Sequence, residues 1–291
     1  MGNGLTIAEL ETTLDGFFAA CVDYKKRTMT LKDGKTAFLC DFKDLTDRRY
    51  IAERIVLPLL TADRGVITVS AKGALKLTAS FSRCTQLYAY SHLTLYEKNG
   101  FYTLLEGALI ASFFSLSENL DCFALAAYLC EASAAVVVPN DGEGEILNLL
   151  LNALYALKSN LFTPEFIKAV FELRLAALSG LEPTVGACPG CGRPLAEADE
   201  RYFFLTEGLI LCPACASGQP ADETPYRLSR AVYAAIAYVT AAKPKAIFSF
   251  RIGDEALRDL SVVAEKYLQN QLERTFPTLE FYKTTRQIPN E

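Results

Sequence analysis

Hydrophobic and polar residues along this chain first follow a strand-like pattern. The stretches 54–61 ("RIVLPLLT") and 65–74 ("GVITVSAKGA") are apolar and rich in β-branched residues, which is typical of strands. Within 91–107, apolar and polar positions alternate on both sides of Asn99-Gly100, a dipeptide that favours a two-residue hairpin turn. Several short strands joined by tight turns predict a small β-barrel over 36–115.

The spacing of apolar residues then changes to a helical period. Apolar residues within 145–159 recur every three to four positions, and Thr163 followed by Pro164 is a typical helix start for 163–180. The apolar run 122–138 is also interpreted as a helix, although its periodicity alone leaves a buried strand open. These stretches together predict a helical bundle.

The two ends of the chain complete the pattern. The stretches 229–242 and 254–276 predict two more helices, the second of them stopped by Pro277. Near the N-terminus, Asp33-Gly34 predicts a hairpin over 28–42. The whole pattern predicts an α+β protein of several domains: an N-terminal extension (1–35), a barrel (36–115), a helical domain (116–187), a cysteine-rich segment (188–223) and helices that complete the helical domain (224–291).

Charge is distributed unevenly along the 291 residues, whose formal net charge is −5. Segment 116–187 carries three Lys or Arg against nine Asp or Glu. Segment 36–115 carries nine against seven, and segment 224–291 carries ten against seven. A polyanion such as a nucleic acid is therefore expected on the barrel or on the C-terminal helices.

The sequence also indicates where the protein resides. No apolar run reaches the ~18–20 residues that span a bilayer. The first residues include acids and no basic lead-in, unlike a signal peptide. Nine cysteines, an odd number in a long chain, favour a reducing compartment. We expect a cytoplasmic protein with no membrane partner.

Four of the cysteines form two Cys-Pro-x-Cys hooks. The hooks are Cys188 with Cys191 and Cys212 with Cys215, separated by twenty residues. This spacing lies at the long edge of the range expected for a four-cysteine zinc site, and the Pro and Gly residues in the hooks favour tight turns. The stretches 201–205 and 208–212 between them predict a hairpin. A zinc ribbon that holds one structural Zn²⁺ per chain is predicted.

A redox pair and a catalytic metal are the alternative roles for these cysteines. A thioredoxin-like motif needs one C-x-x-C after a βαβ strand, which this region does not offer. A catalytic zinc keeps an open position and usually has a His or carboxylate ligand, but His92 is the one histidine. The sequence also lacks a phosphate-binding loop, a nucleophile elbow and an H-E-x-x-H motif. The chain is therefore predicted not to be an enzyme.

The order of these parts resembles the RecO family of bacterial DNA repair and recombination mediators. The resemblance covers roughly residues 36–286. It rests on the paired hooks and on 54–77 ("RIVLPLLTADRGVITVSAKGALKL"), 171–183 ("FELRLAALSGLEP") and 243–283, which begins "KPKAIFSFRIGDEALRDL". The chain departs from the family in its first 35 residues and in the low Arg content of the segment after "AKGA".

The resemblance implies a particular fold and a non-enzymatic function. The barrel is an OB fold, and the zinc finger is inserted into the helical domain. Such a mediator binds single- and double-stranded DNA, anneals complementary strands and helps to load RecA onto DNA covered by single-strand-binding protein. The implied partners are RecR, the acidic C-terminal tail of the single-strand-binding protein and, in some pathways, RecF. The implied location is the nucleoid.

Basic residues on and beside the barrel strand 65–74 are the predicted DNA contacts. They are Arg64, Lys72, Lys76 and Arg83. The nearby Phe81, Tyr88 and Tyr90 would stack on bases or else belong to the core. A rival DNA path runs along the last helices, with Arg258, Lys266 and Arg274.

Arg174 is predicted to contact the acidic tail, because it is one of few basic residues in its segment. The alternative for this side chain is an ordinary surface ion pair, for example with Glu172. For the whole protein, the alternative function is a zinc-ribbon protein-interaction module whose barrel does not bind DNA.

Overall fold

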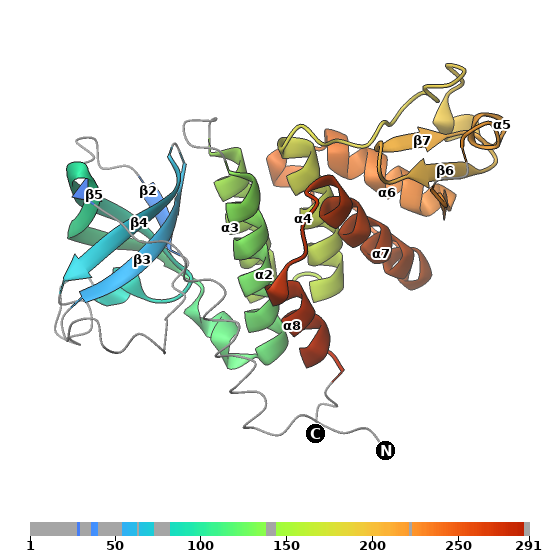
Figure 1. Cartoon of the computed structure of the whole chain (residues 1–291). Helices are drawn as coiled ribbons and strands as arrows, with labels where there is room; N and C mark the ends of the chain where they lie inside the picture. Colours follow the sequence, from blue (N-terminus) through green and yellow to red (C-terminus); the bar gives the residue numbers. More distant parts are fainter. Residues whose placement is uncertain are drawn as a thin grey trace. The chain divides into compact units, whose positions relative to one another are not determined.

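The computed structural model of the chain describes residues 28–29, 36–39, 54–62, 64–72, 82–137, 144–220 and 223–287. The chain divides into two compact units (Figure 1). The first unit comprises Met1–Leu147 and Phe276–Glu291, and the second comprises Asn148–Thr275.

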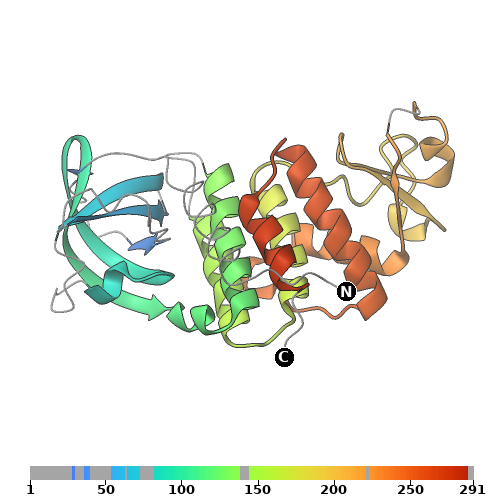
Figure 2. The same ribbon diagram turned by 60° about the horizontal axis from the view of Figure 1, so that its bottom comes forward.

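Five strands form the sheet of the first unit, in the order β1-β5-β2-β3-β4. Their bounds are β1 (Thr28–Met29), β2 (Thr36–Leu39), β3 (Arg54–Thr61), β4 (Gly65–Lys72) and β5 (Ala89–Ser112). A further parallel pairing between β4 and β5 joins the two sides of the sheet, so that the strands curl into a barrel (Figure 2). The predicted small barrel is therefore confirmed.

The long strand β5 contains the hairpin that the sequence predicts. Asn99 and Gly100 both have positive φ, at 55° and 75°, as a two-residue hairpin turn requires. The strand pairings agree with a turn there. The first half of β5 pairs antiparallel with β2, β2 with β3, and β3 with β4, so β4 runs opposite to the first half of β5. The second half of β5 pairs parallel with β4, at Tyr102 and Thr103. The chain therefore reverses direction within β5.

The hairpin predicted over 28–42 is wrong. Both strands of this stretch form, but β1 and β2 each pair with β5, which lies between them in the sheet. A dipeptide such as Asp33-Gly34 favours a local turn, but it does not determine which strands pair in the sheet. The longer β5 offers more hydrogen-bonding and side-chain partners than two short strands offer each other.

Alternating strand residues fill the barrel. Leu57 and Leu59 on β3 and Ile67, Val69 and Ala71 on β4 belong to one buried cluster, as the two-residue period of a strand predicts. The cluster is completed by Cys84, Ala89, Leu93, Leu95 and Leu104. The barrel interior is thus a packed apolar core.

Two helices of the first unit pack together although they are far apart in sequence. Helix α2 (Leu120–Val136) is capped by the side chain of Asn119, and α8 (Pro277–Thr285) packs against it. The rings of Tyr128 and Phe276 meet edge to face, with centroids 5.6 Å apart. The interpretation of 122–138 as a helix is confirmed up to Val136.

One predicted helix boundary is wrong. Helix α7 (Asp254–Gln271) ends before Pro277, at a turn where Glu273 adopts a positive φ of 47°. Pro277 instead begins α8, since a proline at the first helical position loses no intrahelical hydrogen bond. The sequence pattern extended the first helix over this turn and gave no sign of α8.

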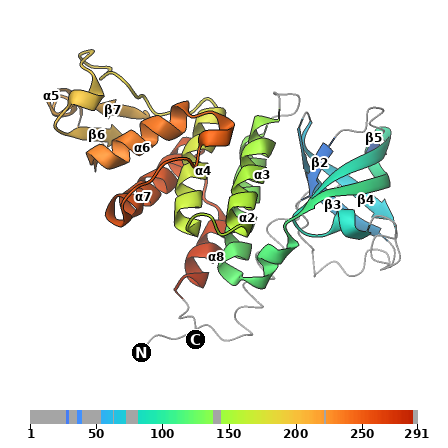
Figure 3. The same ribbon diagram turned by 180° about the vertical axis from the view of Figure 1, so that it is seen from behind.

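Most of the remaining helices form the second unit (Figure 3). They are α3 (Glu145–Lys158), which begins at the boundary between units, α4 (Pro164–Leu178), α6 (Arg230–Ala241) and α7. Thr163 and Ser229 cap α4 and α6 as predicted, each accepting a backbone hydrogen bond from three residues on. Helix α4 packs against both α6 and α7.

A buried charged cluster joins α4 to α7. The Nζ atom of Lys168 lies 3.0 Å from Oε1 of Glu172 and 2.8 Å from Oε2 of Glu265. The side chains of Lys168 and Glu172 are only 4% and 0% exposed. Charges are costly to bury without partners, so each member depends on the others.

A small three-stranded sheet lies between α4 and α6 in the chain. Strands β6 (Arg201–Phe204) and β7 (Leu209–Leu211) form the predicted hairpin, and β8 (Tyr226–Leu228) adds to the other edge of β6. Gly208 adopts a positive φ of 68° at the hairpin turn. Strand β7 ends at the second cysteine hook, which continues into the short helix α5 (Pro213–Ala216).

Candidate functional site

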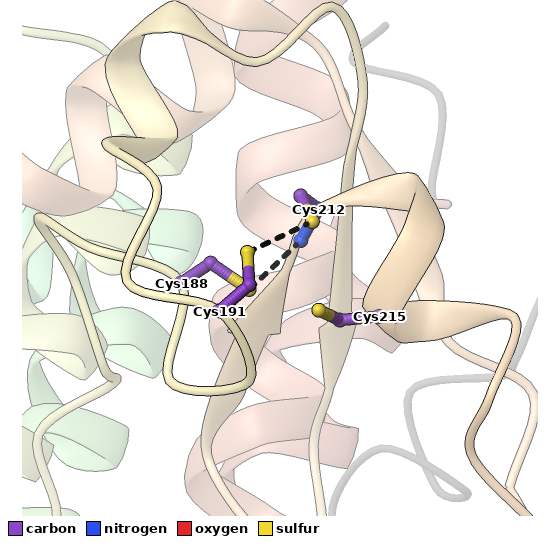
Figure 4. Close-up of side chains that lie close together, drawn as sticks. All are labelled: Cys188, Cys191, Cys212 and Cys215. Carbon is purple, nitrogen blue, oxygen red and sulfur yellow. Dashed lines mark hydrogen bonds between the residues drawn. The ribbon is translucent and has the colours of Figure 1, made fainter.

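The two cysteine hooks meet at one point of the second unit (Figure 4). The four Sγ atoms of Cys188, Cys191, Cys212 and Cys215 lie within 4.8 Å of one another. One pair spans the two hooks, with 3.7 Å between Sγ of Cys191 and Sγ of Cys212. Four convergent thiols in one place could hold a metal ion, and they are compatible with zinc binding.

Backbone hydrogen bonds shape each hook. In the first, the amides of Cys191 and Gly192 donate to the carbonyl oxygen of Cys188. In the second, the amides of Cys215 and Ala216 donate to the carbonyl oxygen of Cys212. These turns bring both thiols of a hook to the same side, which is why a two-residue gap suits metal ligands.

Gly190 is required by the close approach of the second hook. A Cβ atom at this position would lie 2.8 Å from Sγ of Cys215 and 3.0 Å from its Cβ. Any side chain at position 190 would therefore displace Cys215. The glycine therefore provides space, whereas Gly192, with a φ of 72°, provides a left-handed turn.

The surroundings of the thiols favour one thiolate. Burial opposes ionisation of Cys188, but backbone donors from Cys212 and Gly190 and the neighbouring thiols lower its pKa to about 6. The amide of Cys212 lies 3.5 Å from Sγ of Cys188. The pKa of Cys215 is raised to about 12, chiefly because its thiol hydrogen-bonds to Cys191 and Cys212. The thiolate is the form that binds metals.

Arg201 holds the ribbon together and was not predicted from the sequence. Its Nε and Nη2 atoms donate to the carbonyl oxygens of Leu195 and Ala196 at 2.7 and 3.0 Å, and its guanidinium lies 4.8 Å from the ring centroid of Tyr233 on α6. The side chain is buried. Nothing in the residues next to a single arginine in a strand shows that its side chain will be buried and will bond to backbone carbonyl oxygens.

The predicted DNA contacts lie at several places on the barrel. Arg64 lies in the β3–β4 turn, where its amide donates to Oγ1 of Thr61 at 3.0 Å. Lys72 is the last residue of β4, about 26 Å along the strand from Arg64. Arg83 is exposed in a 3-10 helix (Ser82–Thr85), and Lys76 lies outside the described residues.

The aromatic residues near these cations divide in role. Tyr88 is buried, and its hydroxyl donates to the carbonyl oxygen of Phe123 at 3.1 Å, so it belongs to the core and cannot stack on a base. Tyr90 is partly buried on β5, and Phe81 lies outside the described residues. The sequence left base stacking and core packing open for these aromatic residues, and Tyr88 belongs to the core.

Arg174 contacts the end of a helix. Its Nη1 atom donates to the carbonyl oxygens of Thr240 at 2.6 Å and Val239 at 3.4 Å, in the last turn of α6. A cation is favourable there because the last carbonyls of a helix point outward with partial negative charge. Among the described residues, no ion pair joins Arg174 to Glu172, which pairs with Lys168 instead. The partner role of Arg174 stays a prediction.

Together, a closed five-stranded barrel, a helical region and a four-cysteine ribbon define a class of OB-barrel proteins that carry a metal-binding ribbon. Two family models match the chain: "Recombination protein O N terminal" at residues 45–113 and "Recombination protein O C terminal" at residues 117–280. The chain belongs to the RecO family of DNA repair proteins.

Individual relatives agree with this assignment. The chain is 30% identical over 237 residues to the DNA repair protein RecO of Acetivibrio thermocellus, covering 81% of this chain and 92% of that protein. It is 27% identical over 236 residues to RecO of Symbiobacterium thermophilum, covering 81% and 92%. In the part of the chain that the structure describes, no helix is long and apolar enough to cross a membrane.

Proposed function

We propose that this protein is a recombination mediator that binds single- and double-stranded DNA and anneals complementary strands without covalent chemistry. In this proposal it works in the nucleoid with RecR, with the acidic tail of single-strand-binding protein and, in some pathways, with RecF, and it helps to load RecA. The observation that carries the proposal is the match of both RecO domains to the barrel and to the helical region.

The annealing activity gives the direct test of this proposal. The purified protein should accelerate pairing of complementary oligonucleotides that are coated with the cognate single-strand-binding protein. Pairing at the uncatalysed rate, together with no DNA binding at low salt, would favour the alternative of a protein-interaction module.

The ion in the four-cysteine cluster is proposed to be zinc. Tetrahedral zinc with Zn–S bonds of about 2.3 Å places its sulfurs about 3.8 Å apart. The 3.7 Å between Cys191 and Cys212 fits this spacing. Zinc supplies no chemistry in this role: its four thiolate ligands fill its coordination shell and tie the two hooks together.

The barrel is proposed to bind DNA through Arg64, Lys72, Lys76 and Arg83. We expect Lys72→Ala with Arg83→Ala to weaken single-strand binding for all sequences, because phosphate contacts do not read bases. The slope of log K against log salt should fall by about 1.4, since each single-strand phosphate contact contributes ~0.7. A salt titration by fluorescence anisotropy measures this slope.

The matched variant for this test removes two basic residues from α7, the alternative DNA-binding surface. If the slope is unchanged in the barrel variant and falls in Arg258→Ala with Lys266→Ala, the DNA path runs along α7 and not along the barrel. Arg83, Arg258 and Lys266 are exposed. Since surface substitutions rarely cost more than ~0.5 kcal/mol, unfolding midpoints should change little in both variants.

Arg174 is proposed to contact the acidic tail of single-strand-binding protein through those guanidinium N–H groups that do not hydrogen-bond to α6. Arg174→Ala should weaken binding of a tail peptide about tenfold, the effect of losing one hydrogen bond to a charged group. Arg174→Lys keeps the charge and should lose less. Isothermal titration measures both affinities, and an unchanged affinity in Arg174→Ala would leave only the contact with the helix end.

A further inference from the structure

A loop after α6 presents three cations that have no acidic partner. Lys243, Lys245 and Arg251 are exposed, and the loop 243–253 ("KPKAIFSFRIG") contains no acidic residue. Within the described part of the chain, none of these three side chains forms an ion pair. Three such charges within nine residues produce a local positive potential.

Aromatic rings lie among these cations. The ring of Phe248 stacks on that of Phe162, which precedes α4, with centroids 5.7 Å apart and an interplanar angle of 29°. Both residues are partly exposed, and Leu161 beside them is 60% exposed. Phe250 instead packs inward against Phe166 and Tyr238, at 5.0 and 5.1 Å.

The loop is held firmly in place. The hydroxyl of Tyr238 donates to the carbonyl oxygen of Ala246 at 2.7 Å, and Ile247 is buried. The amides of Ala246 and Ser249 also donate to carbonyl oxygens within the loop. Cations and rings on a fixed backbone cost little conformational entropy when a ligand binds.

We propose that Lys243, Lys245, Arg251, Phe162 and Phe248 form a second binding surface for single-stranded nucleic acid, separate from the barrel. The cations would contact phosphates, and the exposed parts of the two rings would stack on bases without regard to sequence. An acidic peptide could use the same cations, but a pair of rings together with cations that precede and follow Phe248 in the chain suits nucleotides better. This inference rests on the proposed DNA binding and gives it a second location, which would let one molecule hold two strands during annealing.

The test compares two double variants of equal charge. Lys245→Ala with Arg251→Ala should reduce the salt slope of single-strand binding by about 1.4. The control, Arg193→Ala with Arg230→Ala, removes two cations of the same unit that are also exposed and should leave the slope unchanged. Phe248→Leu keeps apolar volume and loses the ring, and it should weaken binding about fivefold or more.

Photo-crosslinking locates the contact directly. An oligonucleotide with 5-iodouracil, irradiated with the full-length protein, should label the tryptic peptide Ala246–Arg251, which contains both phenylalanines of the loop. Labelling there and a reduced slope support the surface. If only the barrel variant lowers the slope and no loop peptide is labelled, the surface is overturned while the proposed function stands.

Two further outcomes would also overturn the inference. If the wild-type protein binds no single-stranded DNA at low salt, the proposed function fails, and this surface fails with it. If DNA binding is unchanged in the loop variants but an acidic, apolar peptide loses affinity for them, the surface belongs to a protein partner.

Discussion

Cys191→Ser is expected to release the metal and unfold the ribbon, because structural zinc binding contributes directly to folding free energy. Cys191 is one of four proposed ligands whose Sγ atoms lie within 4.8 Å of one another, and its thiol contacts that of Cys212 in the other hook. Zinc content should fall from about one ion per chain to nearly none after dialysis. The affinity lost is large, since zinc-finger peptides bind the ion with roughly 10–16 kcal/mol.

The matched control is Cys122→Ser, a partly buried cysteine outside the cluster. This variant should keep its zinc and its ribbon. Limited proteolysis separates the two variants, because an unfolded ribbon exposes the chain between α4 and α6. A wild-type protein that is free of metal and fully stable, with its hooks joined by disulfides, would contradict the zinc assignment.

Acid should also release the metal. The Cys188 pKa of about 6 lies below the ordinary thiol value of 9.0, so the folded state favours the thiolate. The stability gained from this lowered pKa is complete above about pH 9 and is lost progressively as the pH falls to about 6, the pKa of the folded state. Zinc release into a chelating dye, followed from pH 8 to pH 5, should increase over this interval.

Lys168→Met is expected to lower the free energy of unfolding by about 3–5 kcal/mol, because it removes the cation that two carboxylates share in a buried site. Glu172 is fully buried, and the side chain of Glu265 is 16% exposed. Methionine matches the length of lysine and packs well, so the loss of charge is the main change. Urea unfolding followed by circular dichroism measures the effect.

An exposed ion pair provides the control for this prediction. Lys283 lies 3.0 Å from Glu280 on α8, and Lys283→Met should cost no more than about 1 kcal/mol. Replacing the whole buried cluster with Lys168→Met, Glu172→Leu and Glu265→Leu should recover most of the stability. If Lys168→Met alone is as mild as Lys283→Met, the buried cluster does not hold α4 to α7.

Local chemistry explains which elements could be predicted from the sequence. The helix starts at Thr163 and Ser229 were predicted because a capping side chain acts within three residues of its own position. The turn at Asn99-Gly100 was predicted because these residues tolerate positive φ. The clustering of the four cysteines was predicted because the two-residue gap in each hook orients both thiols locally.

Contacts between distant residues explain what could not be predicted. The end of α7 depends on a turn at Glu273, and α8 depends on a partner, α2, that lies more than a hundred residues earlier. Tyr88 and Arg201 look like ordinary strand or loop residues in the sequence. Their roles come from Phe123 and Tyr233, which only folding brings near them.

The sequence by itself thus determined the α+β class, the barrel and helical segments, and the four cysteines that converge, since each follows from periodicity or from spacing within a few residues. Only the tertiary structure decided that β5 separates β1 from β2, that Lys168 is buried between two carboxylates, and that Phe162 stacks on Phe248, whose loop carries three cations. These arrangements depend on packing free energy shared among distant residues, which no local pattern in the chain encodes.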